Sequence, residues 1–140
     1  MANVASRAKK RQSSIATDIP QLRPGTTKDI LGLLTLAARA SKRCHFVGFN
    51  SIMKNIENRS VAVVLLCHDA PLPLKEALYV AANTSNIPIR TLHNATSELT
   101  KIYSVNRISC IALPSAEDSE GAASSAVVDG VLDLINASST

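Results

Sequence analysis

The chain has 140 residues, of which 46% are apolar and 19% charged, which is typical of one globular domain with its own hydrophobic core. The net charge of +4 divides unevenly: residues 1–28 carry an excess of five positive charges, residues 29–113 an excess of four, and residues 114–140 five acidic side chains and no basic one. The basic part suits a phosphate backbone, but two Phe, two Tyr and no Trp argue against RNA binding by stacking of bases on aromatic rings.

Residues 1–26 lack hydrophobic periodicity and contain Pro20 and Pro24, so we expect a basic, flexible N-terminal arm. The cluster from Arg7 to Arg11 fits a nuclear localisation signal or an RNA-binding segment, and a solubilising tail explains it about as well. No apolar segment follows this cluster, which argues against a secretory signal, and we expect no segment that spans a membrane.

The first predicted helix begins after Thr26 or Thr27, either of which is a suitable N-cap, and ends near Ala40. The prediction rests on apolar residues at helical spacing, namely Ile30, Leu33, Leu34, Ala37 and Ala38.

A short strand over residues 45–47 is predicted next, and Gly48 ends it. Asn50 is then a natural N-cap for a second helix over residues 50–57. Its apolar residues fall on one face, namely Ile52, Met53 and Ile56.

Residues 61–67 are unbroken apolar positions, which predicts a strand buried on both faces in the centre of a covered sheet. The segment from His68 to Pro71 ends this strand. A third helix that closes at Asn86 follows from the apolar stripe of Leu74, Ala77, Leu78, Ala81 and Ala82. Residues 88–92 then predict another strand.

Residues 93–95 are expected to form a loop, after which Thr96 caps a helix that includes Tyr103. Residues 107–113 have the pattern of a last strand, and residues 114–121 that of an acidic loop. A final amphipathic helix is predicted from Val127, Val128, Val131, Leu132 and Ile135.

This alternation of strands and helices predicts an α/β fold, namely a three-layer α-β-α sandwich with helices on both faces of a mixed sheet of about four strands. We expect one domain over residues 27–140, of which residues 114–140 form the acidic loop and helix.

The sequence gives little support to catalysis or metal binding. Three scattered cysteines beside apolar runs are typical of reduced, buried thiols in an intracellular protein (Cys44, Cys67 and Cys110). Cys44 and His45 are adjacent, so their side chains would diverge on a strand, and we expect no metal site. Without a glycine-rich phosphate loop, we expect no cofactor and no small-molecule substrate. His68 and Asp69 follow the central strand, where α/β sheets often place ligand sites; we favour a capped turn there, with catalysis as the alternative.

The strongest candidate site is the segment Gly48–Lys54, which is expected to place a helix N-terminus directly after a strand. Free backbone N–H groups at such a terminus attract anions. Asn50 and Ser51 can form hydrogen bonds with base edges, and Lys54, four residues after Asn50, can reach a phosphate from the same helix face. Arg43 precedes the strand and adds charge. A well-capped helix with a solvated lysine is the plain alternative.

The pattern Gly48-x-Asn50-x-x-x-Lys54 resembles the Gly-x-Asn-Glu-x-x-Lys signature of the kink-turn-binding ribosomal protein superfamily. The resemblance extends over residues 27–113 and includes Ile87-Pro88-Ile89 and Val105-x-Arg107. It implies a non-catalytic α-β-α protein that binds a kinked internal loop of RNA. It assigns base recognition to Asn50, a phosphate contact to Lys54 and close approach of the RNA to Gly48.

The resemblance also implies that the loop after the third long strand covers an extruded base. The predicted RNA-binding residues are therefore Arg43, Gly48, Phe49, Asn50, Ser51 and Lys54, together with His93, Asn94, Ala95 and Thr96. Ser51 stands where the signature has Glu, so we expect a kinked loop that departs from the standard kink-turn.

Within the superfamily, residues 65–67 and the segment Val105–Ser109 look most like the protein subunits of RNase P and RNase MRP. This resemblance implies a nuclear and nucleolar ribonucleoprotein that processes tRNA and rRNA, in which RNA and other protein subunits are the partners and the RNA performs the reaction. A divergent large-subunit ribosomal protein, a snoRNP core protein and a protein–protein module without an RNA role are the alternatives.

Overall fold

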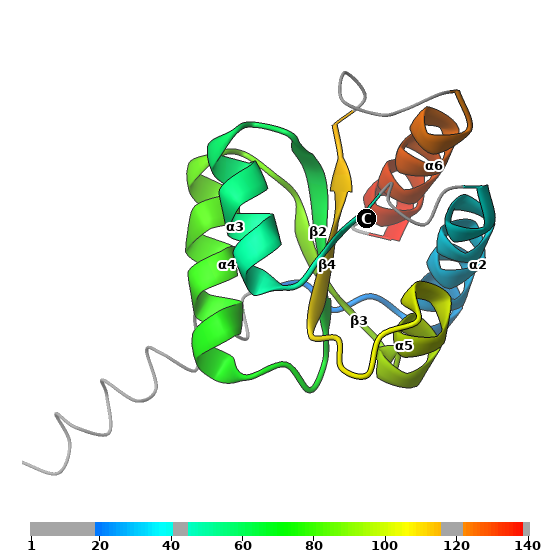
Figure 1. Cartoon of the computed structure of the whole chain (residues 1–140), viewed down its shortest axis with the longest axis horizontal. Coiled ribbons are helices and arrows are strands. Elements are labelled where there is room, and N and C mark those ends of the chain that lie inside the picture. Colours follow the sequence, from blue (N-terminus) through cyan, green and yellow to red (C-terminus); the bar gives the residue numbers. More distant parts are fainter. Residues whose placement is uncertain (1–18, 41–44, 116–121, 139–140) are drawn as a thin grey trace, which may run out of the picture.

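The fold is seen in a computed structural model that describes residues 19–40, 45–115 and 122–138 (Figure 1). In chain order its elements are α2 (Pro24–Ala40), β1 (Phe46–Val47), α3 (Phe49–Glu57), β2 (Val61–Cys67), α4 (Leu72–Thr84), β3 (Ile89–Leu92), α5 (Thr96–Tyr103), β4 (Cys110–Pro114) and α6 (Ala122–Ser138). The prediction of a single α/β domain with a mixed sheet of four strands is confirmed.

The strands follow the order β1-β4-β2-β3 across the sheet. β4 is antiparallel to both of its neighbours, and β2 is parallel to β3, so β1, β2 and β3 all run in the same direction. β2 spans residues 61–67 as predicted, and six of its seven residues are buried. Its buried position follows from its apolar sequence, because a strand between two others must present apolar side chains to both covering layers.

Helices cover both faces of the sheet (Figure 1). α3 and α4 lie on one face, where the core contains Val64 and Leu66 of β2. α2, α5 and α6 lie on the other face, where the core contains Val63 and Leu65. Successive β2 side chains alternate between the two cores, as the pleat of a strand requires. α2 and α6 approach closely at Gly130, where an added Cβ would lie 3.1 Å from a methyl carbon of Leu33.

The part of the expected arm that the structure describes lies against the sheet. Ile19 and Leu22 are buried. The backbone N–H of Leu22 donates to the carbonyl of Thr91, and the N–H of Thr91 donates to the carbonyl of Pro20. Residues 19–23 therefore run beside β3. The prediction that a flexible arm extends to residue 26 is wrong for these residues. The cluster from Arg7 to Arg11 lies outside the described residues.

The other element boundaries differ by a few residues. α2 begins at Pro24 rather than after Thr26, because proline suits the first position of a helix, where no N–H bond is needed. β4 begins at Cys110 rather than at residue 107. α6 extends the predicted last helix at both ends. Within the described residues, no helix is long and apolar enough to cross a membrane.

Cys67 and Cys110 are free and buried, which confirms the prediction for these two residues. Their side chains belong to the cores on opposite faces of the sheet. Burial raises the pKa of both thiols, that of Cys110 to about 12, so these thiols stay protonated near neutral pH. Cys44 lies outside the described residues.

Candidate nucleic-acid interface

One edge of the sheet collects the beginnings of α2, α3, α4 and α5. β1, β2 and β3 end at this edge, and α3, α4 and α5 each follow one of them. α2 begins there too, because the hydroxyl oxygen of Thr27 accepts the backbone N–H of His93 in the loop after β3. We call this side of the molecule the helix-start edge. The partial positive charges of the helix N-termini add together there.

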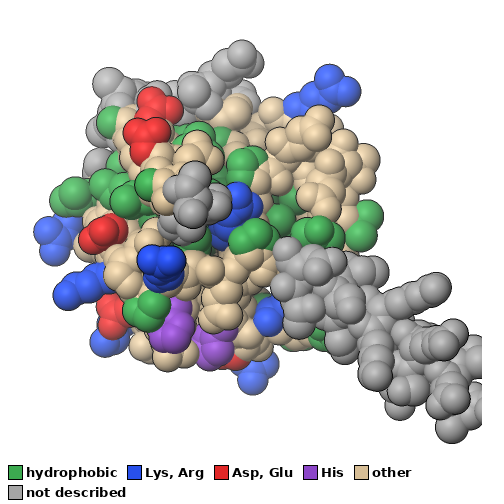
Figure 2. All heavy atoms as spheres, turned by 180° about the vertical axis from the view of Figure 1, so that it is seen from behind, with side chains coloured by type: hydrophobic (Ala, Val, Ile, Leu, Met, Phe, Trp, Pro, Cys, Tyr) green, Lys and Arg blue, Asp and Glu red, His purple; other side chains and the backbone are tan. Residues whose placement is uncertain are grey.

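The first turns at the helix-start edge leave their backbone N–H groups open to a ligand. No side chain caps α3, α4 or α5, and α2, α3 and α4 have no acidic residue in the first turn. In Figure 2, histidine side chains lie together at the lower end of the face opposite to that of Figure 1, with lysine, arginine and acidic side chains around them. An uncapped helix start with nearby cations favours anionic ligands.

The turn at Gly48 takes a backbone conformation that requires glycine. Gly48 precedes α3 with φ 96° and ψ 155°, a region that residues with a side chain rarely adopt. Its N–H donates to the carbonyl of Cys110, and its carbonyl accepts the N–H of Ile52. An added Cβ would meet no atom within 4 Å, so glycine is needed for the dihedral angles and not for space.

The prediction that Asn50 is the N-cap of this helix is wrong. Gly48 is the N-cap, because α3 already begins at Phe49. The Asn50 side chain is exposed, as is that of Lys54 one turn later. Ser51 is half-buried, and its carbonyl accepts a hydrogen bond from the Asn55 amide. Asn50 and Lys54 thus lie one turn apart on a solvent-facing side of α3, and both are available to a ligand.

Two buried contacts fix the position of this turn. Phe49 packs against the core under α3 and α4. His45, directly before β1, is buried and shares a hydrogen bond through Nδ1 with the Tyr103 hydroxyl at the end of α5. Burial lowers the pKa of His45 to about 4, so the ring is neutral near pH 7. His45 is therefore a structural residue. Arg43, also predicted as a site residue, lies outside the described residues.

The loop after β3 presents some of its predicted site residues and buries one. Asn94 is exposed and has φ 45°, and His93 is half-buried beside it. Ala95 is fully buried in the core, so its side chain cannot touch a ligand. Thr96 is not the N-cap of α5, because the helix already begins at Thr96 and Ala95 is the N-cap. The Thr96 hydroxyl donates to the carboxylate of Asp69, with 2.7 Å between the oxygens.

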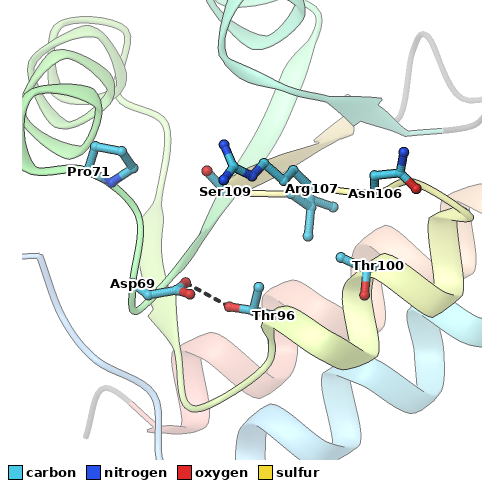
Figure 3. A pocket seen from close by; sticks show the side chains of 8 residues that line it. Asp69, Pro71, Thr96, Thr100, Asn106, Arg107 and Ser109 are labelled. Carbon is cyan, nitrogen blue, oxygen red and sulfur yellow. Dashed lines mark hydrogen bonds between the residues drawn. The ribbon is translucent and has the colours of Figure 1, made fainter.

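β1 and β3 are the two outer strands, so the Gly48 turn and the loop at residues 93–96 lie at opposite ends of the helix-start edge. A pocket of about 380 Å³ lies beyond the ends of the central strands, among the turn after β2, the start of α5 and the segment before β4. Figure 3 shows Asp69 and Thr96 on one side of this pocket, with Asn106, Arg107 and Ser109 on the other. We call it the edge pocket. It contains the charged side chains of Asp69 and Arg107, which were not among the predicted RNA-binding residues.

Within the edge pocket, the Thr96 hydroxyl holds the pKa of Asp69 below its ordinary value. The carboxylate is therefore ionised near neutral pH and accepts hydrogen bonds. Asp69 accepts from Thr96, whereas the His68 backbone carbonyl accepts from Lys75. The position of Asp69 after the central strand was visible in the sequence. The proximity of Arg107 was not, because it lies on a distant segment that only the strand order brings close to Asp69.

No group of His, Cys, Asp and Glu residues in the described part of the chain is arranged to hold a metal ion. His45 faces Tyr103 rather than a cluster of such ligands.

Comparison with known proteins gives one family and several similar folds. The model of the ribosomal protein L7Ae/L30e/S12e/Gadd45 family matches residues 28–122, more than half of the chain. No curated protein matches the chain in sequence. Among solved structures, a protein of unknown function from Bacillus halodurans is similar at 26% identity with a TM-score of 0.57, over 74% of this chain and 96% of that one. A 15.5 kD RNA-binding protein from Giardia lamblia is similar at 17% identity with a TM-score of 0.70, over 85% of this chain and 94% of that one, which shows a shared fold.

Proposed function

Because the chain belongs to the ribosomal protein L7Ae/L30e/S12e/Gadd45 family, we propose that it is a non-catalytic RNA-binding subunit of a ribonucleoprotein. It binds a kinked internal loop of RNA along the helix-start edge. The observation that carries this proposal is the uncapped start of α3, with Asn50 and Lys54 both exposed one turn apart on the helix.

The start of α3 and its solvent-facing side offer the three kinds of contact that an RNA loop needs. Its open N–H groups and the Lys54 ammonium attract phosphate. The Asn50 amide both donates and accepts, so it can read the edge of an unpaired or non-standard base pair. Gly48 has no side chain to keep the RNA backbone away from this turn. The half-buried Ser51 provides a short hydroxyl where the family signature has the longer Glu, which fits a kinked loop that departs from the standard kink-turn.

The edge pocket extends the same surface. It lies at the same end of the sheet, includes Thr96 of the loop at residues 93–96, and its walls are mostly polar side chains. Single-stranded and bulged RNA is recognised through bases that leave the helical stack. We assign the edge pocket to such an extruded base, which Thr96 contacts from the loop at residues 93–96.

We further propose that the particle is nuclear RNase P or RNase MRP, which places the chain in the nucleus and nucleolus. The support is the resemblance of residues 65–67 and Val105–Ser109 to those subunits. The partners are then the particle's RNA and its other protein subunits. Cleavage of the phosphodiester bond belongs to that RNA and not to a side chain of this protein.

Crosslinking the protein to RNA in living cells and sequencing the bound RNA tests this assignment. We expect RNase P or RNase MRP RNA to be enriched. Ribosomal RNA alone would replace the RNase P and MRP assignment with a ribosomal one, and the absence of any enriched RNA would overturn the RNA-binding proposal.

The located site is tested by the double substitution Asn50→Ala with Lys54→Ala, which we expect to abolish binding to an RNA hairpin that contains a kinked internal loop. The matched control is Asn58→Ala with Arg59→Ala, which removes the same kinds of side chain after the other end of α3. Both proteins should keep the wild-type circular dichroism spectrum. Equal affinities of the two variants would refute the site.

A further inference from the structure

The edge pocket contains an acceptor and a donor of opposite charge that do not satisfy each other. Asp69 and Arg107 both line it, and both are exposed. The two charges stand on opposite sides of the pocket, as Figure 3 shows, with space for a ligand between them.

The Asp69 carboxylate is held in place for a ligand. Thr96 donates to Oδ1, which fixes the turn after β2 against the start of α5. Among the side chains that the structure describes, Thr96 is the one that donates a hydrogen bond to this carboxylate. A carboxylate has about four acceptor positions, so it can accept from a ligand as well. An ionised carboxylate accepts hydrogen bonds and cannot donate them. A base that places its own acceptor atoms opposite Asp69 is therefore disfavoured.

Guanine is the base that suits both charges. Its N1–H and N2–H groups form a pair of donors that matches a carboxylate, and its O6 and N7 form a pair of acceptors that matches a guanidinium. Uracil has one N–H donor between two carbonyl acceptors. Adenine and cytosine place a ring-nitrogen acceptor beside the amino group that would face the carboxylate.

Resting on the function proposed above, we propose that the edge pocket selects guanine as the extruded base of the bound RNA, with Asp69 accepting from N1–H and N2–H and Arg107 donating to O6 and N7. Asn106 and Ser109, on the wall that carries Arg107, supply further polar groups around the base.

The test compares four RNA hairpins with the same kinked internal loop that differ only in the extruded nucleotide. We expect wild-type protein to bind the guanine hairpin about tenfold more tightly than the uracil hairpin, because each bidentate contact discriminates by roughly that factor. Asp69→Asn should remove most of this preference, since the amide places an NH₂ donor where one carboxylate oxygen accepted. Asp129→Asn, an exposed carboxylate on α6 that does not line the pocket, is the matched control and should keep it.

The outcomes separate this inference from the function on which it rests. Equal wild-type affinity for all four hairpins would overturn guanine selection and leave RNA binding intact. Loss of binding to all four would overturn the proposed function itself. A preference that survives in Asp69→Asn would show that another group reads the base and refute the assignment. Guanosine monophosphate should not displace the guanine hairpin at comparable concentrations; displacement would identify the pocket as a site for free nucleotides and overturn the proposal.

Discussion

The Thr96 hydroxyl donates a hydrogen bond of 2.7 Å to the carboxylate of Asp69, which ties the first residue of α5 to the turn after β2. This bond joins two of the loops that meet at the helix-start edge. It also decides the charge of the edge pocket, because it is the largest cause of the lowered pKa of Asp69.

Thr96→Val should therefore raise the pKa of Asp69 toward its ordinary value. A carboxyl with a lowered pKa stabilises the fold above its ordinary pKa and loses that contribution as the pH falls through the lowered value. Asp69 is exposed, so we expect a stability change below about 1 kcal/mol. NMR titration of the Asp69 carboxyl carbon measures the pKa. Thr100→Val is the control, since that hydroxyl donates to Ser97, and identical titration in both variants would contradict the assignment.

Gly48→Ala should destabilise the fold by about 1–3 kcal/mol although the added methyl meets no atom, because the backbone conformation at Gly48 is one that essentially only glycine adopts. Urea unfolding monitored by circular dichroism measures the difference. Gly32→Ala provides the comparison, since Gly32 lies inside α2, has open space around it and has no positive φ. We expect that change to stabilise the fold by about 0.5–1 kcal/mol. An unchanged free energy of unfolding in Gly48→Ala would show that this backbone conformation does not require glycine.

The fold should lose stability when His45 is forced to accept a proton. Its pKa is about 4 in the folded chain and 6.5 in the unfolded one, so between these values the unfolded state binds more protons. The contribution of neutral His45 is complete above pH 6.5 and declines as the pH falls toward 4. Each unit of depression corresponds to about 1.4 kcal/mol.

Urea unfolding at pH 7 and pH 5 measures this loss, and His45→Gln should reduce the difference between the two values. His68→Gln changes an exposed histidine instead and should leave the pH dependence as in wild type. The same pH dependence in His45→Gln as in wild type would mean that other groups cause it.

Lys54→Gln should weaken RNA binding and reduce the slope of log affinity against log salt concentration by about 1, because one phosphate contact is lost. Fluorescence anisotropy over a series of salt concentrations gives the slope. Arg59→Gln removes one positive charge beyond the other end of α3 and should leave the slope unchanged. A slope that falls equally in both variants would indicate a general charge effect rather than a contact by Lys54.

The sequence predicted the parts of the fold that depend on local pattern. Residues 61–67 formed a strand with the predicted bounds, because unbroken apolar residues of that length fit only a strand covered on both sides. The sequence did not predict that residues 19–23 run beside β3. Their hydrogen bonds to Thr91 are made by backbone atoms, and such bonds require no periodic pattern of apolar side chains.

The candidate site was predictable only where it is continuous in the chain. Gly48, Asn50 and Lys54 could be placed on one turn from their spacing alone. Asn50 was misassigned as a cap because the helix begins one residue earlier than its polar sequence indicates. The edge pocket joins Asp69, Thr96 and Arg107, which come from three separate segments, and their proximity depends on the insertion of β4 between β1 and β2.

That insertion also has a consequence during protein synthesis. β4 is the last strand in the chain, yet it is the neighbour of both β1 and β2. A nascent chain on the ribosome cannot pair β1 or close the edge pocket until the segment Cys110–Pro114 has emerged. Such late, non-local pairing slows folding. The protein should therefore acquire its RNA after translation has passed this strand, and the nascent chain should remain unable to bind RNA through this edge while most of it is being made.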